Sequence, residues 1–337
     1  CTGYKSIERA AKIITEKLKD KPSDDTIEWL VKNHFLPPYF KDIQQQLKHL
    51  KEKIIANSIG DNGAIERLVI GGGTDLVVQK PLAVKKSAPA LVFDNEQLKG
   101  ISLKNGNIYI GASATVTDFA ESEILKNAFP NLPQYIKLIS STPIRNMATI
   151  AGNLVNASPI GDMTIFLLAL DASIILNKTG MQRTIKLKDF YKGYKTLGKE
   201  ADEIIEAVYF STPVKKAYFN FEKVSKRTHL DIASVNSACT IHLDGDVITE
   251  IYLSAGGVAP FPKFLRNTVS FLKSKPIDEN SLSEAIKIMN GEIAPISDAR
   301  GTADYKRLLL RQLFLAHIIK CFGAKPVKKL LLNDNRN

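Results

Sequence analysis

The stretch Val69-Ile70-Gly71-Gly72-Gly73-Thr74-Asp75-Leu76 places three consecutive glycines directly after a short apolar segment, Leu68 to Ile70. The apolar segment predicts a buried strand. Glycine reaches backbone conformations that are closed to other residues and lets a ligand approach the main chain closely. Successive amide N–H groups in such a turn form a concave nest that binds anions. The stretch therefore predicts either a tight turn after a strand or a pyrophosphate site, and on these residues alone we weight the two equally.

A second stretch of small, hydroxylated and amide side chains runs from Thr149 to Asp162, between apolar flanks. Its sequence is Thr-Ile-Ala-Gly-Asn-Leu-Val-Asn-Ala-Ser-Pro-Ile-Gly-Asp. Two anion-binding turns in one chain can hold the two halves of a dinucleotide. We therefore expect the two turns to converge on a single diphosphate.

The composition is that of a folded protein with more than one domain. A chain of 337 residues exceeds one ordinary core, so we expect two or three domains. An apolar content of 44% and a charged content of 24% exclude the disordered and fibrous classes. The longest apolar run, Ile165 to Leu176, is interrupted by Asp171 and is shorter than the roughly 20 residues that a membrane span needs. We therefore expect no membrane span.

The cysteines, histidines and charges exclude further classes. Cys1, Cys239 and Cys321 are widely separated, which argues against a disulfide framework and fits a reducing compartment such as the cytoplasm. These thiols and the five scattered histidines lack metal-site spacing, so we expect no metal in this chain. The net charge of +11 comes without a zinc-finger or RNA-binding motif, so we expect no nucleic-acid partner.

Hydrophobic patterning predicts the elements around the two turns. The pattern predicts helices over 7–18, 43–55, 118–125 (with an N-cap at Thr117), 132–142 (ended by Pro143), 281–289 and 305–321. It predicts strands over 66–70, 91–94, 105–112, 173–177, 184–187, 204–210, 218–224, 234–243 and 247–254. Asp244-Gly245-Asp246 predicts a hairpin turn in an antiparallel sheet. This order of elements indicates an α+β architecture.

Taken together, the two turns resemble the flavin motifs of the FAD-binding medium subunit or domain of the molybdenum hydroxylases, the xanthine dehydrogenase and carbon monoxide dehydrogenase group. Gly71 to Leu76 resembles the first motif, and Thr149 to Asn153, followed by Ser158-Pro159 and Asp162, resembles the second. The similarity covers nearly everything from about residue 35 to 322, and it continues through 190–196, Lys223, 227–233 and 254–259.

The resemblance implies a vanillyl-alcohol-oxidase-type (PCMH-type) FAD-binding fold, in which two α/β subdomains clasp FAD and a C-terminal α+β domain of antiparallel sheet and helices covers one side. The FAD-binding domain would span 39–213, with subdomains of about 39–95 and 96–213, followed by the C-terminal molybdenum-hydroxylase flavoprotein domain over 214–325 and a basic tail over 326–337. The fold that the resemblance implies is not a Rossmann fold, and consistently Gly71 to Gly73 are contiguous and lack the G-x-G-x-x-G spacing.

The N-terminus resembles a different domain of the same family. Cys1-Thr2-Gly3-Tyr4 is similar to the last cysteine block of the family's iron–sulfur domain. The resemblance implies that 1–20 is a remnant of a [2Fe–2S] domain helix and that 21–38 is a linker. Because the other ligands are missing here, Cys1 would be an orphaned [2Fe–2S] ligand. The intact polypeptide would then fuse a [2Fe–2S] domain upstream of the flavin domain.

The resemblance also assigns contacts with FAD. Thr74 would offer a hydroxyl to the pyrophosphate and Leu76 would face the flavin or its ribityl chain, while Ser158 and Asp162 would meet the adenosine ribose. Asp75, however, also fits a helix N-cap, and Ser158 with Asp162 also fits a cap of the helix from Met163. The backbone amides that would form the cradle are those of Ile70, Gly71, Gly72, Gly73, Thr74, Asp75 and Leu76, continued by Thr149, Gly152 and Asn153.

Further residues match family positions at the flavin ring. Ile139, Ser140 and Ile144 match positions that line the flavin, and they fit ordinary helix core equally well. Ile205 matches a position that packs on the isoalloxazine ring, with buried strand core as the alternative. Lys223 matches a position at the polar edge of the ring, where a cation would stabilise the reduced anionic flavin. A surface lysine is the alternative for Lys223.

These implications together describe an electron-transfer module of a xanthine dehydrogenase-like oxidoreductase. A molybdenum cofactor on a large subunit would oxidise the substrate, and [2Fe–2S] clusters would pass electrons to FAD on this chain. The FAD would then reduce NAD+ or another acceptor, within a hetero-oligomer, and the chain would need no catalytic side chain of its own. The alternatives are a stand-alone flavin-dependent oxidase of the same superfamily and a flavin-free scaffold.

Overall fold

The computed structural model describes residues 3–59, 68–87, 89–214 and 216–332, and it divides the chain into two compact units, Cys1–Gly63 and Ala64–Asn337. Cys1, which the resemblance implies to be an orphaned [2Fe–2S] ligand, lies outside the described residues, as does most of the expected tail. Within the described ranges, no helix is long and apolar enough to cross a bilayer.

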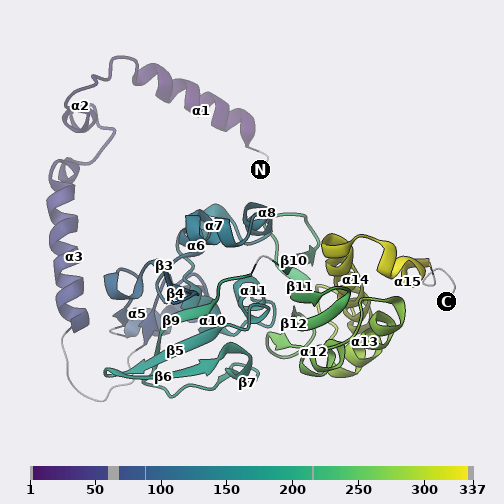
Figure 1. The fold of residues 1–337 in the computed structure, drawn as a ribbon. Helices are drawn as coiled ribbons and strands as arrows, with labels where there is room; N and C mark the ends of the chain where they lie inside the picture. The colour runs from purple at the N-terminus through teal and green to yellow at the C-terminus, as the bar shows by residue number, and fades with distance from the viewer. Residues whose placement is uncertain (1–2, 60–67, 88, 215, 333–337) are drawn as a thin grey trace. The chain divides into compact units, whose positions relative to one another are not determined.

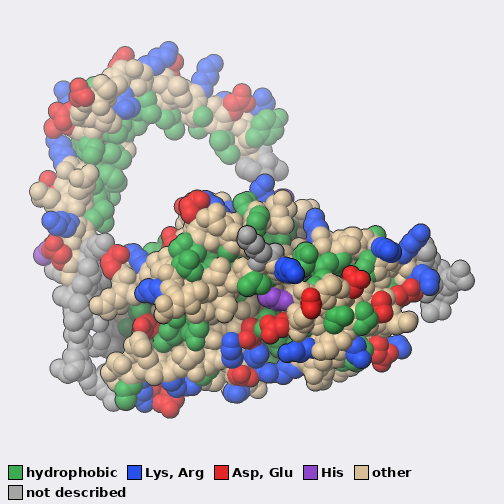
Figure 2. Space-filling view, in the orientation of Figure 1, with side chains coloured by type: hydrophobic (Ala, Val, Ile, Leu, Met, Phe, Trp, Pro, Cys, Tyr) green, Lys and Arg blue, Asp and Glu red, His purple; other side chains and the backbone are tan. Residues whose placement is uncertain are grey.

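The N-terminal unit is built from helices, and η1 contacts both α2 and α3. Its elements are α1 (Tyr4–Lys17), α2 (Thr26–Lys32), the 3-10 helix η1 (Pro38–Asp42) and α3 (Ile43–Ile59). Helix α2 lies in the segment expected as a linker, and α3 lies in the region that the sequence assigned to the FAD-binding domain. Neither α1, α2 nor η1 contains a buried residue. Figure 2 shows hydrophobic side chains gathered along one side of α1.

The second unit opens with a small parallel pair of strands that frames the glycine stretch. Strand β1 (Val69–Ile70) pairs in parallel with β2 (Ala90–Leu91). Parallel strands need a crossover connection, and here it contains α4 (Leu76–Gln79) and α5 (Pro81–Lys86). The three glycines therefore form the connection from β1 to α4.

A five-stranded antiparallel sheet follows, in the order β3-β4-β9-β5-β6 (Figure 1). Its strands are β3 (Ile101–Lys104), β4 (Asn107–Gly111), β5 (Ser173–Lys178), β6 (Met181–Lys186) and β9 (Ile204–Ser211). Alternate residues such as Ile108 and Ile110 are fully buried, as the two-residue period of a strand requires. The 3-10 helices η2 (Glu96–Leu98) and η3 (Leu187–Asp189) and the hairpin of β7 (Tyr191–Gly193) and β8 (Thr196–Leu197) join these elements.

The helices after β4 differ in their ends from the expectation. They are α6 (Val116–Glu121), α7 (Glu123–Ala128), α8 (Leu132–Lys137), α9 (Thr142–Arg145), α10 (Ile150–Asn156) and α11 (Asp162–Leu168). The N-cap of α6 is Thr115, not Thr117, because the side chains of Thr115 and Asp118 form a reciprocal capping box. Pro143 does not end the helix from 132; it lies in the first turn of α9, where a missing N–H costs nothing.

The C-terminal part is a four-stranded antiparallel sheet of β10 (Ala217–Ser225), β11 (Ala233–Asp244), β12 (Val247–Gly256) and β13 (Lys263–Phe264). The predicted hairpin at Asp244-Gly245-Asp246 is confirmed, and Gly245 adopts a positive φ of 57° there. Helices α12 (Arg266–Leu272), α13 (Glu279–Glu292) and α14 (Ala303–Phe322) pack on the sheet (Figure 1), and η4 (Lys325–Val327) and α15 (Lys328–Leu332) follow.

Two hydrophobic cores lie on opposite faces of this second sheet. Cys239 and Ile241 of β11 belong to the core under α13 and α14, whereas Ala238 belongs to the core of the five-stranded sheet. Ser254 of β12 also donates a hydrogen bond to the carbonyl of Ile165 in α11 (2.7 Å). Helix α11 therefore packs directly on the C-terminal sheet. It is the helix that follows the second small-residue stretch.

Candidate cofactor site

The two small-residue turns lie against each other. A Cβ atom on Gly72 would overlap the carbonyl oxygen of Met147, and one on Gly71 would lie 2.7 Å from the Thr149 hydroxyl oxygen. Gly73 has a φ of +70°, a conformation that residues with a side chain rarely adopt. The glycines are thus required by close approach to the second turn, and the two turns meet as the sequence predicts.

The first turn presents an unpaired run of backbone donors. The six successive amides from Gly71 to Leu76 donate no hydrogen bond to any residue in the described part of the chain. Buried or half-buried amides are normally paired, so a run of this length is unusual. Thr74 and Leu76 are half-buried and Asp75 is exposed. Such a concave run of N–H groups is the geometry that holds an anion.

The edges of this turn are fixed by the elements beside it. Ile70 is 6% exposed at the end of β1, and its carbonyl accepts a hydrogen bond from the Val92 amide (2.9 Å). Helix α4 begins at Leu76, but the side chain of Asp75 makes no capping hydrogen bond. Asp75 therefore occupies the N-cap position of α4, as the alternative interpretation expects, but without a capping hydrogen bond from its side chain.

The second stretch is not a turn over most of its length, because Ile150–Asn156 form helix α10. The Gly152 and Asn153 amides, expected to continue the cradle, both donate to Thr149 at the start of this helix. The Thr149 hydroxyl accepts from the Gly152 amide (3.1 Å) and so caps α10. The Asn153 carbonyl oxygen accepts from both the amide (3.1 Å) and the hydroxyl (2.9 Å) of Thr164. The Asn153 backbone amide donates to the Thr149 carbonyl (3.0 Å), whereas its side-chain nitrogen has no partner among the described residues and remains available as a donor.

Ser158 and Asp162 do not cap α11. The N-cap of α11 is Gly161, without a side-chain capping bond, and the Ser158 carbonyl accepts from the Gly161 amide (2.9 Å). The Asp162 carboxylate instead accepts from the Lys223 ammonium (2.7 Å) and the Asn236 amide (2.6 Å). Burial raises the pKa of Asp162, while Lys223 and Asn236 oppose that shift by stabilising the ionised form.

Asp162 and Lys223 lie together, although the resemblance implies different roles for them. Those roles place Asp162 at the adenosine ribose and Lys223 at the flavin ring, which are opposite ends of FAD. The two side chains are 2.7 Å apart, and the Lys223 side chain is only 3% exposed. They therefore form one ion pair, and the FAD contacts implied for Asp162 and Lys223 remain predictions.

The apolar site residues fall into two groups. Ile139 (2% exposed) and Ile205 (4% exposed) belong to the core of the five-stranded sheet, as the alternative interpretation of them holds. Ile144 is 42% exposed and can contact a ligand. Ser140 has a positive φ of 50°, and its carbonyl accepts from Arg145 (2.7 Å). The structure thus brings Ile144, but not Ile139 or Ile205, to the surface.

Sequence reasoning missed two residues at this site, Met147 and Asn236. The Met147 carbonyl forms the wall against Gly72, a contact that no side-chain pattern reveals. Asn236 is fully buried in β11, and its side-chain oxygen has no hydrogen-bond partner among the described residues. A Cβ atom on Gly256 would overlap that oxygen. The only sequence signal for Asn236 was its polar amide side chain within a predicted strand.

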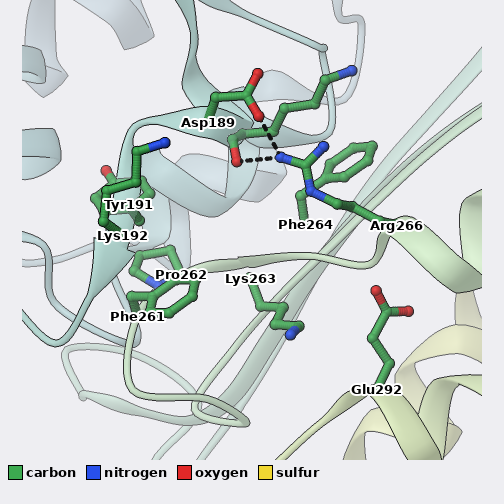
Figure 3. Close-up of a pocket in the computed structure, with 10 residues that line it drawn as sticks. Asp189, Tyr191, Lys192, Phe261, Pro262, Lys263, Phe264, Arg266 and Glu292 are labelled. Atoms are coloured by element: carbon green, nitrogen blue, oxygen red, sulfur yellow. Dashed lines mark hydrogen bonds and ion pairs between the residues drawn. The ribbon is translucent and has the colours of Figure 1, made fainter. Parts of the chain in front are cut away.

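A pocket of about 170 Å³ lies apart from both turns, and none of the predicted site residues lines it (Figure 3). Its two carboxylates already have partners. Asp189 pairs with Arg266 (2.6 Å), and Glu292 accepts from the backbone amides of Asn267 and Thr268 in the first turn of α12. Its walls are η3 with β7 on one side and the segment around β13 on the other; the lining residues are Lys188, Asp189, Tyr191, Lys192, Phe261, Pro262, Lys263, Phe264, Arg266 and Glu292.

Comparison with known protein families gives two matches that together span most of the chain. Residues 57–213 match the FAD binding domain in molybdopterin dehydrogenase. Residues 220–320 match the CO dehydrogenase flavoprotein C-terminal domain. The first match ends just after β9, the last strand of the five-stranded sheet in sequence, and the second begins within β10, the first strand of the four-stranded sheet.

Three curated relatives are similar over most of their own length. The glyceraldehyde dehydrogenase medium chain of Sulfolobus acidocaldarius is 28% identical over 247 residues, covering 72% of this chain and 86% of the relative. The nicotinate dehydrogenase FAD-subunit of Eubacterium barkeri is 27% identical, covering 73% and 85%. The carbon monoxide dehydrogenase medium chain of Hydrogenophaga pseudoflava is 26% identical, covering 76% and 88%.

Solved structures share the fold. A chain of CO dehydrogenase from Oligotropha carboxidovorans superposes with a TM-score of 0.69 at 24% identity, covering 77% of this chain and 90% of that chain. A chain of quinoline 2-oxidoreductase from Pseudomonas putida 86 gives a TM-score of 0.67 at 23% identity, covering 81% and 93%. The α+β FAD-binding fold expected from the sequence is therefore confirmed.

Proposed function

Because the chain belongs to the family of FAD-binding subunits of molybdenum hydroxylases, we propose that the two convergent turns are where it holds the diphosphate of FAD. The observation that carries this proposal is the run of six unpaired amides beside a second turn that only glycine can approach. A diphosphate is an anion that such amides bind without a cationic side chain.

The residues present fit this cofactor. The amides from Gly71 to Leu76, the Thr74 hydroxyl and the Asn153 side-chain amide are donors, as phosphate oxygens require. Exposed Ile144 offers apolar contact for the ring system. FAD supplies the redox chemistry when bound. The chain itself binds and orients the cofactor and sets the electrostatics around it.

The proposal extends to the assembly. Electrons from substrate oxidation at a molybdenum cofactor on a large subunit pass through [2Fe–2S] clusters to this FAD and on to NAD+ or another acceptor. The hetero-oligomer works in the cytoplasm, and xanthine is one of several substrates open to it. The naming of the relatives as medium chains and FAD subunits supports this arrangement.

The N-terminal unit fits a fused iron–sulfur domain. Helix α1 leaves Tyr4, Ile7, Ile13 and Ile14 between 50% and 65% exposed. An apolar stripe on an otherwise polar helix needs a partner surface. We assign that surface to a [2Fe–2S] domain upstream of Cys1.

A visible absorption spectrum of the purified chain, followed by release and chromatography of the chromophore, tests the proposal. We expect a yellow protein that releases one FAD. It should show no turnover of organic substrates until the molybdenum-bearing subunit is added. A colourless chain that rejects added FAD would instead identify a flavin-free scaffold. Turnover of an organic substrate by the chain alone would identify a stand-alone oxidase.

A further inference from the structure

Asn156, the last residue of α10, joins three segments that are distant in the sequence. Its side-chain oxygen accepts a hydrogen bond from Gln79 (3.3 Å), the last residue of α4, and another from the Lys195 ammonium (2.9 Å). Its backbone carbonyl also accepts from Lys195. Lys195 lies in the turn between β7 and β8. None of these contacts belongs to the hydrophobic core.

The helices that meet at Asn156 are those that start at the two anion-binding turns. Helix α4 begins directly after the glycines, and α10 begins after its N-cap Thr149. At 1.5 Å per residue, the four residues of α4 and the seven of α10 carry the chain only about 6 Å and 10 Å from the turns. The two helices are therefore held at both ends, by glycine packing at the turns and by Asn156 at the far end.

The conformation of Lys195 supports a specific role in this junction. Lys195 adopts a positive φ of 55°, which L side chains rarely adopt without an external constraint. A cation is favoured at the carboxyl end of a helix, where the last carbonyls of α10 lie. Burial lowers the pKa of Lys195, while the charge of Asp75 acts in the opposite direction. Lys195 thus lies within electrostatic reach of the first turn.

We infer that Gln79, Asn156 and Lys195 form a clasp that fixes the distance and angle between the two turns, and so positions them for the diphosphate of FAD. This inference rests on the proposed function. Asn156 acts only as a hydrogen-bond acceptor in the clasp, because both Gln79 and Lys195 donate to it. An aspartate at position 156 can accept the same two bonds, whereas an alanine cannot.

Fluorescence titration of the flavin-free 337-residue chain with FAD tests the clasp. We expect Asn156→Ala and Lys195→Met each to raise the Kd for FAD by about tenfold, the scale of losing one charge-assisted hydrogen bond. Asn156→Asp should retain the wild-type Kd. The thermal midpoint of the flavin-free chain should stay within about 2 to 4 °C of the wild type in all three variants, because hydrogen bonds are lost but no core residue is altered. Lys192→Met is the matched control, since Lys192 lies in β7 and its side chain makes no hydrogen bond or ion pair with a described residue.

Each other result counts against the clasp. An unchanged Kd in Asn156→Ala, an Asn156→Asp variant as weak as Asn156→Ala, or a Lys195→Met variant equal to Lys192→Met would overturn it while leaving FAD binding intact. A thermal midpoint that falls by about 10 °C or more together with the affinity would show a merely structural role. A wild-type chain that binds no FAD would overturn the proposed function and the clasp together.

Discussion

The Lys223 ammonium lies 2.7 Å from the Asp162 carboxylate, and the two side chains are 3% and 13% exposed. Lys223 comes from β10 of the C-terminal sheet, and Asp162 begins α11. Lys223 also donates to the Leu138 carbonyl (2.8 Å), just after α8. One buried cation thus joins the C-terminal sheet to two segments of the FAD-binding region, so this pair couples the two parts that would enclose the cofactor.

Lys223→Met should destabilise the fold strongly. The change leaves the Asp162 carboxylate buried with Asn236 as its remaining partner, and an unpaired buried charge costs about 3 kcal/mol or more. Chemical unfolding monitored by circular dichroism measures the loss. The double variant Lys223→Met with Asp162→Asn removes the charge as well, so it should recover part of the lost stability. Equal stability of the wild type and Lys223→Met would contradict the view that the pair holds the domains together.

Gly72→Ala should abolish FAD binding. The added methyl group would overlap the Met147 carbonyl, so the first turn must move away from the second. Titration with FAD should show a loss of at least 100-fold in affinity, on the order of 3 kcal/mol.

Gly291→Ala is the matched control for this variant. Gly291 lies in α13, and a Cβ atom added there would meet no other atom within 4 Å. The variant should gain about 1 kcal/mol of stability from better helix propensity. Its affinity for FAD should equal that of the wild type. A Gly72→Ala variant that binds FAD normally would show that the close approach of the turns is not needed for the cofactor.

Local signals were sufficient for much of the fold. The Asp244-Gly245-Asp246 turn and the alternation around it specify β11 and β12 because a two-residue period and a positive-φ glycine are local properties. The helix ends were less determined. A proline fits both the end of one helix and the start of the next, and Pro143 lies at the start of α9. Thr115 and Thr117 both precede a helical pattern, and only the reciprocal bond with Asp118 selects Thr115.

The long-range contacts of the site were beyond local patterns. The two small-residue turns could be predicted to meet, because two anion-binding turns in one chain can hold a single diphosphate between them. Nothing local indicates that Asp162 pairs with Lys223, which is 61 residues away, or that Asn236 joins them. The antiparallel pairing of β10 with β11 places Lys223 opposite Asn236, and this pairing brings the two residues together at Asp162.

His317 should make the chain less stable as the pH falls. It is fully buried in α14, where its Nδ1 contacts the Asn220 amide (2.9 Å) and its Nε2 contacts the Ser237 hydroxyl (3.1 Å). Burial lowers the pKa of His317 to about 3 from an ordinary 6.5. Between these values the unfolded chain binds a proton that the folded chain does not, so the chain loses about 1.4 kcal/mol of stability for each unit that the pH falls from 6.5 towards 3, and this group causes no further loss below that.

His317→Gln separates this effect from the other acidic and basic groups. The glutamine amide can accept from Asn220 and donate to Ser237 but cannot take up a proton. The Ser237 hydroxyl donates to the Ser254 carbonyl (2.8 Å), so it accepts from position 317, and the neutral histidine carries its proton on Nε2. Unfolding in urea at pH 4.5, 5.5 and 7 should show a shallower pH dependence in His317→Gln than in the wild type. Parallel pH profiles for the two proteins would mean that His317 is protonated in the folded chain, with Asn220 turned to accept from it.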